Sequence, residues 1–337
     1  MVVDFSFYMS LAIKEAWKYQ GLTYPNPAVG CAVVSNSGEL LSVEAHKKAG
    51  KPHAEIEALK SAYYKLTDDK SILHVEDSSD IHNFLLKNHN NCFNDVSLYT
   101  TLEPCSHIGK TPSCATLISK LNISKVYVGS CDTNEEASCG NEVLRKSGLH
   151  VEEDILHVEC EKLLKPFKLW QEENFIFFKW AQRLNGTVDD GIISSHESRE
   201  HVHALRDVCD LIVIGGNTVR VDRPTLDARL VNGKAPDVLI ISKGKEFDRT
   251  IPLFNIDGRE VIISDNFSTC KDYKNILIEG TSSMFELTKS IVDYHLCYLA
   301  PKLGGRNVFD KSNDNFEILN TEQVGKDIIM WMKREVK

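Results

Sequence analysis

The segment HAE at 53–55 and the cysteines Cys105 and Cys114 are the residues best suited to chemistry in this chain. Cys105 follows a proline, and an eight-residue loop separates it from Cys114 at the start of a predicted helix. Two thiolates and the His53 imidazole are typical ligands of zinc, and three ligands leave the fourth tetrahedral position open for water. Zinc lowers the pKa of that water toward neutrality, so a hydroxide nucleophile is available at pH 7.

Glu55 has a role that differs from that of a ligand. Displacing an amino group from a pyrimidine-type ring carbon requires protons to move from the water to a ring nitrogen and to the departing ammonia, and one carboxylate beside the metal serves both transfers. His-x-Glu together with Pro-Cys is the signature of zinc deaminases. Taken alone, HAEIEAL at 53–59 also fits an ordinary helix start after Pro52. The cysteines further along the chain favour zinc.

The elements that position these residues alternate between helices and strands. The helical spacing of Met9, Ala12, Ile13 and Ala16 predicts a first helix. We expect helices at 6–20, from 52 onward and at 114–121, with strands at 31–34, 96–100 and 126–129. This order predicts an α/β/α domain with a parallel or mixed sheet. Residues 67–95 are rich in polar residues and are interpreted as a surface excursion.

The second half of the chain repeats the α/β pattern. A helix at about 155–172 precedes strands at 175–179, 211–215, 238–242, 260–264, 276–279 and 296–300, with helices at 196–208 and 282–292. The boundary is expected near 172, where two glutamates precede an apolar strand. The predicted domains are therefore 1–172 and 173–337.

Composition limits the classes of function. The chain has 337 residues, of which 42% are apolar and 26% charged, as in a globular protein of two domains. The net charge of -9 argues against a nucleic acid as the main partner. No run has the length of a membrane span. The ten scattered cysteines suit reduced thiols, so we expect a cytoplasmic protein without a membrane partner.

Three segments of the first half resemble a known family. They are PNPAVG (25–30), KKAGKPHAE (47–55) and TLEPCSHIGKTPSC (101–114). They are similar to the deaminase half of the bifunctional riboflavin-biosynthesis deaminase/reductase family, which has a cytidine-deaminase-like fold. The resemblance implies a phosphorylated pyrimidine substrate, 2,5-diamino-6-ribosylamino-4(3H)-pyrimidinone 5′-phosphate. It implies that Asn26 reads the ring edge and that Lys110 and Thr111 approach the ribose phosphate.

The second half resembles the reductase half of the same family, whose fold is similar to dihydrofolate reductase. The similar segments are FFKWAQRLNGTV (177–188), the stretch 197–230, LIEG (277–280) and LAPKLGG (299–305). Carried over by position, the NADPH contacts are Ala181, Thr218, Asp222, Ser242 and residues from Thr281 onward. Those around the substrate are Lys179, Ser195, Arg206, Leu226, Arg229 and Glu279. The resemblance also implies a homodimer.

Several alternatives stay open from the sequence. Asn26 also fits an Asx turn between two prolines, Lys110 fits a solvated surface residue, and Arg206 and Arg229 fit ordinary ion pairs. The stretch 186–198 is shorter than the family pattern and lacks its tryptophan-bearing turn, and Thr281 replaces a common glycine. Rival hypotheses are a deaminase with a degenerate reductase domain and a nonenzymatic zinc-containing RNA-binding protein. Glu55 argues against the latter, because a structural zinc needs no proton carrier.

Overall fold

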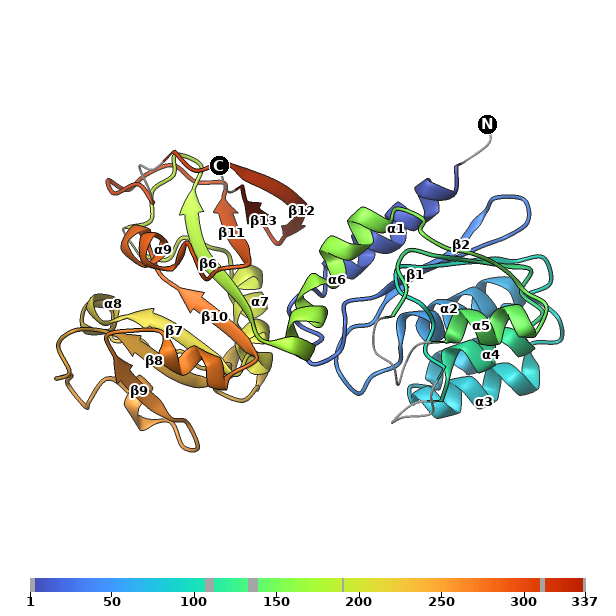
Figure 1. The fold of residues 1–337 in the computed structure, drawn as a ribbon, viewed down its shortest axis with the longest axis horizontal. Coiled ribbons are helices and arrows are strands. Elements are labelled where there is room, and N and C mark those ends of the chain that lie inside the picture. Colours follow the sequence, from blue (N-terminus) through green and yellow to red (C-terminus); the bar gives the residue numbers. More distant parts are fainter. Residues whose placement is uncertain (1–3, 107–111, 133–138, 190, 310–312, 336–337) are drawn as a thin grey trace. The chain divides into compact units, whose positions relative to one another are not determined.

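A computed structural model describes residues 4–106, 112–132, 139–189, 191–309 and 313–335 (Figure 1). The chain divides into two compact units, residues 1–167 and 168–337, and each is described separately. None of the helices in the described ranges is both long and apolar enough to cross a lipid bilayer.

The first unit is built on a five-stranded sheet in the order β2-β1-β3-β4-β5. The strands are β1 (Gly30–Val34), β2 (Leu40–Ala45), β3 (Ser97–Thr100), β4 (Lys125–Val128) and β5 (His150–Glu152). β1 is antiparallel to β2 and β3, whereas β3, β4 and β5 are parallel. The sheet is therefore mixed, as the sequence predicts, and β2, which precedes the metal-binding helix, was not expected.

Helices cover both faces of this sheet. They are α1 (Phe5–Trp17), α2 (Ala54–Thr67), α3 (Ser78–Asn88), α4 (Cys114–Lys120), α5 (Gly140–Lys146) and α6 (His157–Glu172). α1 packs closely on β1, since a Cβ atom on Gly30 would lie 1.9 Å from the Ala12 carbonyl oxygen. On the other face, Cys31 and Val33 join the buried cluster formed with α2 and α4. This confirms the three-layer α/β/α prediction.

The segment 67–95 is not the surface excursion that its polarity predicts. It forms a 3₁₀ turn, η1 (Lys70–His74), and the helix α3, which begins at an Asp77 cap. Ile72, Ile81, Leu85 and Phe93 are fully buried in the main core cluster of the unit. Ile81 and Leu85, at helical spacing, place one face of α3 in the core, whereas Asp80, Asn83 and Lys87 are exposed.

The second unit has an eight-stranded sheet in the order β12-β13-β11-β6-β10-β7-β8-β9. The strands are β6 (Phe175–Arg183), β7 (Leu211–Gly215), β8 (Asp237–Ile241), β9 (Val261–Ser264), β10 (Asn275–Glu279), β11 (Tyr294–Ala300), β12 (Phe316–Val324) and β13 (Asp327–Arg334). The six strands from β11 to β9 in this order are parallel, and β13 and β12 continue the sheet antiparallel. The α/β class is confirmed, while β12 and β13 were not predicted.

The helices of the second unit lie beside the central strands. They are α7 (His196–Val208), α8 (Gly216–Asp222) and α9 (Ser282–Thr288), with 3₁₀ turns η2 (Arg229–Val231), η3 (Pro252–Asn255) and η4 (Ser268–Asp272). Met284 and Phe285 of α9 are buried against one face, with Phe178 and Ile278. Since strand side chains alternate, their neighbours Lys179 and Glu279 point to the opposite face, where α7 lies.

Candidate functional site

His53, Cys105 and Cys114 converge, with ligand atoms that all lie within 4.8 Å of one another. The His53 Nδ1 atom is 3.6 Å from the Cys105 Sγ and 3.5 Å from the Cys114 Sγ. Zn–S bonds of about 2.3 Å and Zn–N bonds of about 2.0–2.1 Å place tetrahedral sulfur and nitrogen ligands about 3.6 Å apart. The three residues therefore fit one tetrahedral zinc ion and leave one coordination position free for water.

Local capping brings the two cysteines together. The Ser113 hydroxyl donates to the Cys105 carbonyl oxygen at 2.9 Å and accepts from the Thr116 amide as the N-cap of α4. The Cys114 amide points at the Cys105 Sγ at 3.4 Å. These bonds tie Cys105 to the start of α4, where backbone amides without partners inside the helix favour a thiolate.

The charges at the site are arranged for proton transfer and metal binding. Hydrogen bonds with the Cys114 thiol and with His53 lower the pKa of Cys105, which therefore ionises readily. Glu55 lies in the first turn of α2 and only 4% of its surface is exposed. Burial raises the pKa of Glu55 to about 7, and the positive charge of a bound zinc ion would oppose this shift. A carboxylate buried beside His53 and the two cysteines suits a group that both takes and returns a proton.

His46 connects Asn26 to the backbone next to the metal ligand His53. His46 was not identified from the sequence. The Asn26 Nδ2 is 3.1 Å from the His46 Nε2, and the His46 Nδ1 is 3.0 Å from the Pro52 carbonyl oxygen. Burial lowers the pKa of His46 to about 4, so the ring is neutral, donates to Pro52 and accepts from Asn26. The available sequence signal was the position of His46 shortly before His53. Lys110 and Thr111 lie outside the described residues.

In the second unit, Glu279 joins two cations on the α7 side of the sheet. Its carboxylate accepts a hydrogen bond from the Arg206 Nε at 2.8 Å and lies 3.7 Å from the Lys179 Nζ. Lys179 and Glu279 are register partners on β6 and β10. Burial by itself raises the pKa of Glu279, but the charges of Arg206 and Lys179 outweigh it and lower the pKa to about 2. The structure thus brings together three of the residues predicted around the substrate.

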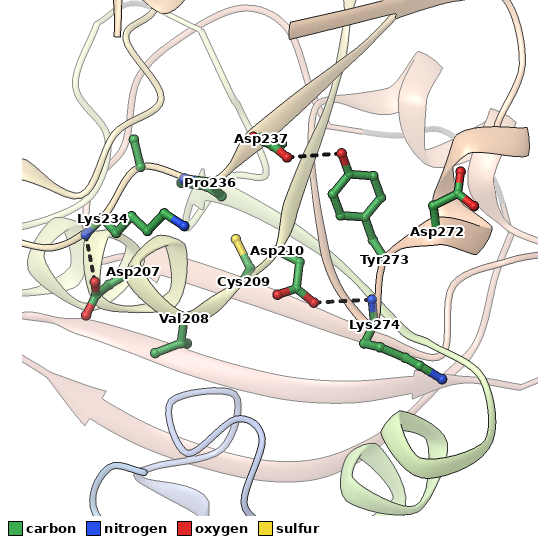
Figure 2. A pocket seen from close by; sticks show the side chains of 11 residues that line it. Asp207, Val208, Cys209, Asp210, Lys234, Pro236, Asp237, Asp272, Tyr273 and Lys274 are labelled. Carbon is green, nitrogen blue, oxygen red and sulfur yellow. Dashed lines mark hydrogen bonds between the residues drawn. The ribbon is translucent and has the colours of Figure 1, made fainter. Parts of the chain in front are cut away.

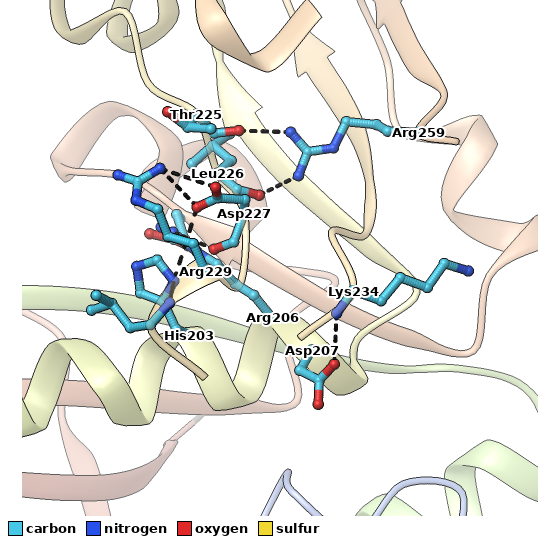
Figure 3. A network of polar contacts seen from close by, with 11 residues as sticks. His203, Arg206, Asp207, Thr225, Leu226, Asp227, Arg229, Lys234 and Arg259 are labelled. Atoms are coloured by element: carbon cyan, nitrogen blue, oxygen red, sulfur yellow. Dashed lines mark hydrogen bonds and ion pairs between the residues drawn. The ribbon is translucent and has the colours of Figure 1, made fainter. Parts of the chain in front are cut away.

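Arg229 and Leu226 lie on the loop that follows α8 and borders this cluster (Figure 3). Arg229 donates to both carboxylate oxygens of Asp227, at 2.9 and 3.0 Å, and the Asp227 carbonyl accepts from Arg206 at 3.3 Å. Leu226 has a φ of 55°, in the left-handed region. Asp227, which connects the two arginines, was not identified from the sequence because its role depends on how the loop folds onto α7.

Ser195 does not join this cluster. It caps the start of α7, accepting from the Ser198 amide, and its own amide donates to Asp327 on β13 at 2.7 Å. Arg206 lies eleven residues later on the same helix, and a rise of 1.5 Å per residue separates the two by about 16 Å. Only a ligand that extends along α7 can contact both.

The residues predicted to contact NADPH lie mainly at the carboxyl edge of the parallel strands. Thr218 and Asp222 are on α8, directly after β7, while Ser242 follows β8 and Thr281 follows β10. Ala181 lies near the end of β6 and pairs with Tyr298. Gly216 lets α8 approach β8, because a Cβ atom there would lie 2.6 Å from the Ser242 Cβ. Ligands of open α/β sheets bind at this edge.

A pocket of about 460 Å³ lies at the opposite, amino edge of β7, β8 and β10 (Figure 2). Asp210 accepts from the Lys274 and Asn275 amides, and Asp237 accepts from the Tyr273 hydroxyl at 3.0 Å. These carboxylates tie down the beginnings of the strands. The pocket is therefore separate from the predicted cofactor positions.

The chain matches two family models. Residues 4–130 match the cytidine and deoxycytidylate deaminase zinc-binding region, and residues 175–330 match the RibD C-terminal domain. Because both halves match, the comparison favours two activities over a deaminase alone.

Relatives of similar length agree. The riboflavin biosynthesis protein RibD of Buchnera aphidicola is 32% identical, with 96% of each chain covered, and that of Aquifex aeolicus is 29% identical, with 97% of this chain and 98% of the relative covered. The crystal structure of a Thermotoga maritima deaminase/reductase covers 98% of both chains with a TM-score of 0.64 and 26% identity. Together these matches show that the chain belongs to the RibD family of riboflavin biosynthesis proteins, bifunctional enzymes that combine a zinc-dependent deaminase with an NADPH-dependent reductase.

Proposed function

We propose that the chain deaminates 2,5-diamino-6-ribosylamino-4(3H)-pyrimidinone 5′-phosphate and then reduces the ribosyl group of the product to ribityl. The Thermotoga maritima relative is described as a diaminohydroxyphosphoribosylaminopyrimidine deaminase and 5-amino-6-(5-phosphoribosylamino)uracil reductase, which supports this substrate pair. We assign deamination to residues 1–172 and reduction to residues 173–337.

In the deaminase site we assign His53, Cys105 and Cys114 to the metal and Glu55 to proton transfer. Zinc, when bound, activates a water molecule for attack on the amino-bearing ring carbon. The Glu55 carboxylate takes one proton from the attacking water and passes it to the ring nitrogen. It then takes the remaining proton from the hydroxyl group added to the ring carbon and delivers it to the amino group, so that the C–N bond breaks, a carbonyl forms and ammonia leaves. The convergence of the three ligands beside a buried carboxylate is the observation that carries this proposal.

We assign Asn26 to the ring edge of the substrate. Its amide nitrogen is engaged with the neutral His46, which fixes the orientation of the amide and leaves its oxygen to accept from a ring amino group. His46 also binds the carbonyl that precedes His53, so the ring-reading amide and the metal ligand are supported by one side chain. Lys110 and Thr111 are assigned to the ribose phosphate from the family resemblance.

In the reductase site we assign Lys179, Arg206, Arg229 and Glu279, with Ser195 and Leu226, to the phosphorylated substrate. Cations outnumber carboxylates in the cluster around Asp227 and Glu279, which favours a phosphate. NADPH, when bound, supplies the hydride to the ribosyl C1′. Ala181, Thr218, Asp222, Ser242 and Thr281 are assigned to holding it at the carboxyl edge of the sheet.

We further propose a homodimer in the cytoplasm, with no nucleic acid or membrane partner. All ten cysteines carry free thiols in the structure, which suits a reducing compartment. The homodimer rests on the family resemblance, and light scattering of the purified full chain tests it.

The decisive experiment measures zinc content, ammonia release and NADPH oxidation on the same preparation. We expect one zinc per chain, and NADPH oxidation that depends on prior deamination. Glu55→Gln should keep the zinc while ammonia release falls about 10²–10⁴-fold. Cys114→Ala should lose both, and Cys92→Ala, outside the ligand set, should lose neither. Ammonia release that survives Glu55→Gln unchanged would overturn the deaminase assignment, and a folded protein without NADPH oxidation would overturn the reductase assignment.

A further inference from the structure

The loop that carries Leu226 and Arg229 is held by a residue outside it, Arg259 (Figure 3). The Arg259 Nη1 donates to the Thr225 carbonyl oxygen at 2.6 Å, and its Nη2 donates to the Leu226 carbonyl oxygen. Its Nε donates to the Pro236 carbonyl oxygen at 2.7 Å. One guanidinium therefore binds the connection between α8 and β8, residues 223–236, near both of its ends.

This segment needs such support because its backbone is irregular at Leu226, next to the Asp227 that contacts both arginines. Leu226 is buried and takes a left-handed conformation that non-glycine residues rarely adopt without surrounding contacts. The bond from Arg259 reaches the carbonyl of this same residue. Asp227 follows directly, with its carbonyl bound by Arg206 and its carboxylate by Arg229. The position of both arginines thus depends on a backbone segment that Arg259 holds.

Arg259 is itself firmly placed. It follows Gly258, whose φ of 73° forms the turn into β9, and the next residue, Glu260, donates its amide to Asp237 at 2.8 Å. These three hydrogen bonds of the Arg259 side chain all go to backbone carbonyls. A lysine has the same charge but lacks the planar fork that satisfies three carbonyls at fixed positions.

We propose that Arg259 is a positioning residue of the reductase site, which sets the loop 225–229 so that Arg206 and Arg229 bind the substrate phosphate. This inference rests on the proposed function of that site. It gives Arg259 no contact with substrate or NADPH.

The test compares Arg259→Lys and Arg259→Gln with Arg249→Lys, an exposed arginine that stacks on Phe254. The substrates are the deaminated 5′-phosphate and the same compound without phosphate. Arg259→Lys should lower kcat/KM for the phosphorylated substrate about 10- to 100-fold, mainly through KM, because the anion-binding arginines are misplaced. The KM for NADPH, ammonia release, and kcat/KM for the dephosphorylated compound should stay within about twofold of wild type.

A role in folding alone would lower kcat/KM for both substrates equally, and that result would overturn the inference. Unchanged kinetics in both Arg259 variants would overturn it as well. If the wild-type protein itself does not prefer the phosphorylated substrate, the proposed function of the site fails instead. If neither variant folds, the test is amide hydrogen exchange of residues 225–231 in the wild-type protein without ligand. Slow exchange supports the proposal that Arg259 holds this segment, and exchange as fast as in an unstructured loop contradicts it.

Discussion

Replacing Glu279 by glutamine should destabilise the second unit, because it leaves Arg206 and Lys179 buried without their carboxylate. The Glu279 side chain is 13% exposed, and its pKa is about 2 instead of the ordinary 4.5. A difference of about 2.5 pKa units corresponds to about 3 kcal/mol of unfolding free energy at pH 7. The contribution is fully present above pH 4.5 and is lost as the pH falls toward 2, since the unfolded state binds the proton first. Between pH 7 and 3.5 the difference in unfolding free energy between wild type and Glu279→Gln should shrink by about 1 kcal/mol.

The assay is urea denaturation of the full chain, with unfolding monitored by hydrogen exchange of the β6 and β10 amides. These amides report the unfolding free energy of the second unit alone. Glu260→Gln, an exposed residue of the same unit, serves as the control and should change stability by less than about 0.5 kcal/mol. A loss of less than about 1 kcal/mol at pH 7, or an equal loss at pH 7 and 3.5, would show that Glu279 does not stabilise the buried cations.

Three further predictions concern other parts of the molecule. Ile81→Ala in α3 should lower the unfolding free energy of the first unit by about 2–4 kcal/mol, because Ile81 is fully buried. The control Lys87→Ala, at an exposed position of the same helix, should leave the unfolding free energy nearly unchanged in the same denaturation experiment. Equal effects of the two substitutions would mean that α3 does not pack as described. Removal of zinc by a chelator should abolish ammonia release but leave NADPH oxidation of the already deaminated substrate intact, and a parallel loss of both activities would contradict two separate sites. Arg206→Lys should raise the KM for the phosphorylated substrate about tenfold in steady-state assays without changing the KM for NADPH, whereas the reverse pattern would place Arg206 at the cofactor.

The metal site could be predicted from the sequence because its residues lie in short motifs at the starts of helices. His53 directly precedes α2 and Cys114 begins α4, so the chemistry of a His-x-Glu and a Pro-Cys segment is recognisable without knowing how the chain folds. The alternation of apolar strands and amphipathic helices likewise predicted most elements of both sheets. Periodicity is a local property, and it survives in the sequence.

The strand β12 and the packing of α3 could not be predicted in this way, because the local pattern of each is mostly polar and burial depends on distant partners. The apolar run in β13 was not recognised as a strand. The dependence on distant partners also holds for His46 and Arg259. Each binds backbone carbonyls that only the folded chain brings near, Pro52 for one and Thr225 and Pro236 for the other. The sequence thus determined which residues can hold zinc and move protons, whereas the tertiary structure decided which side chains hold those residues in place, because backbone-directed hydrogen bonds leave no motif.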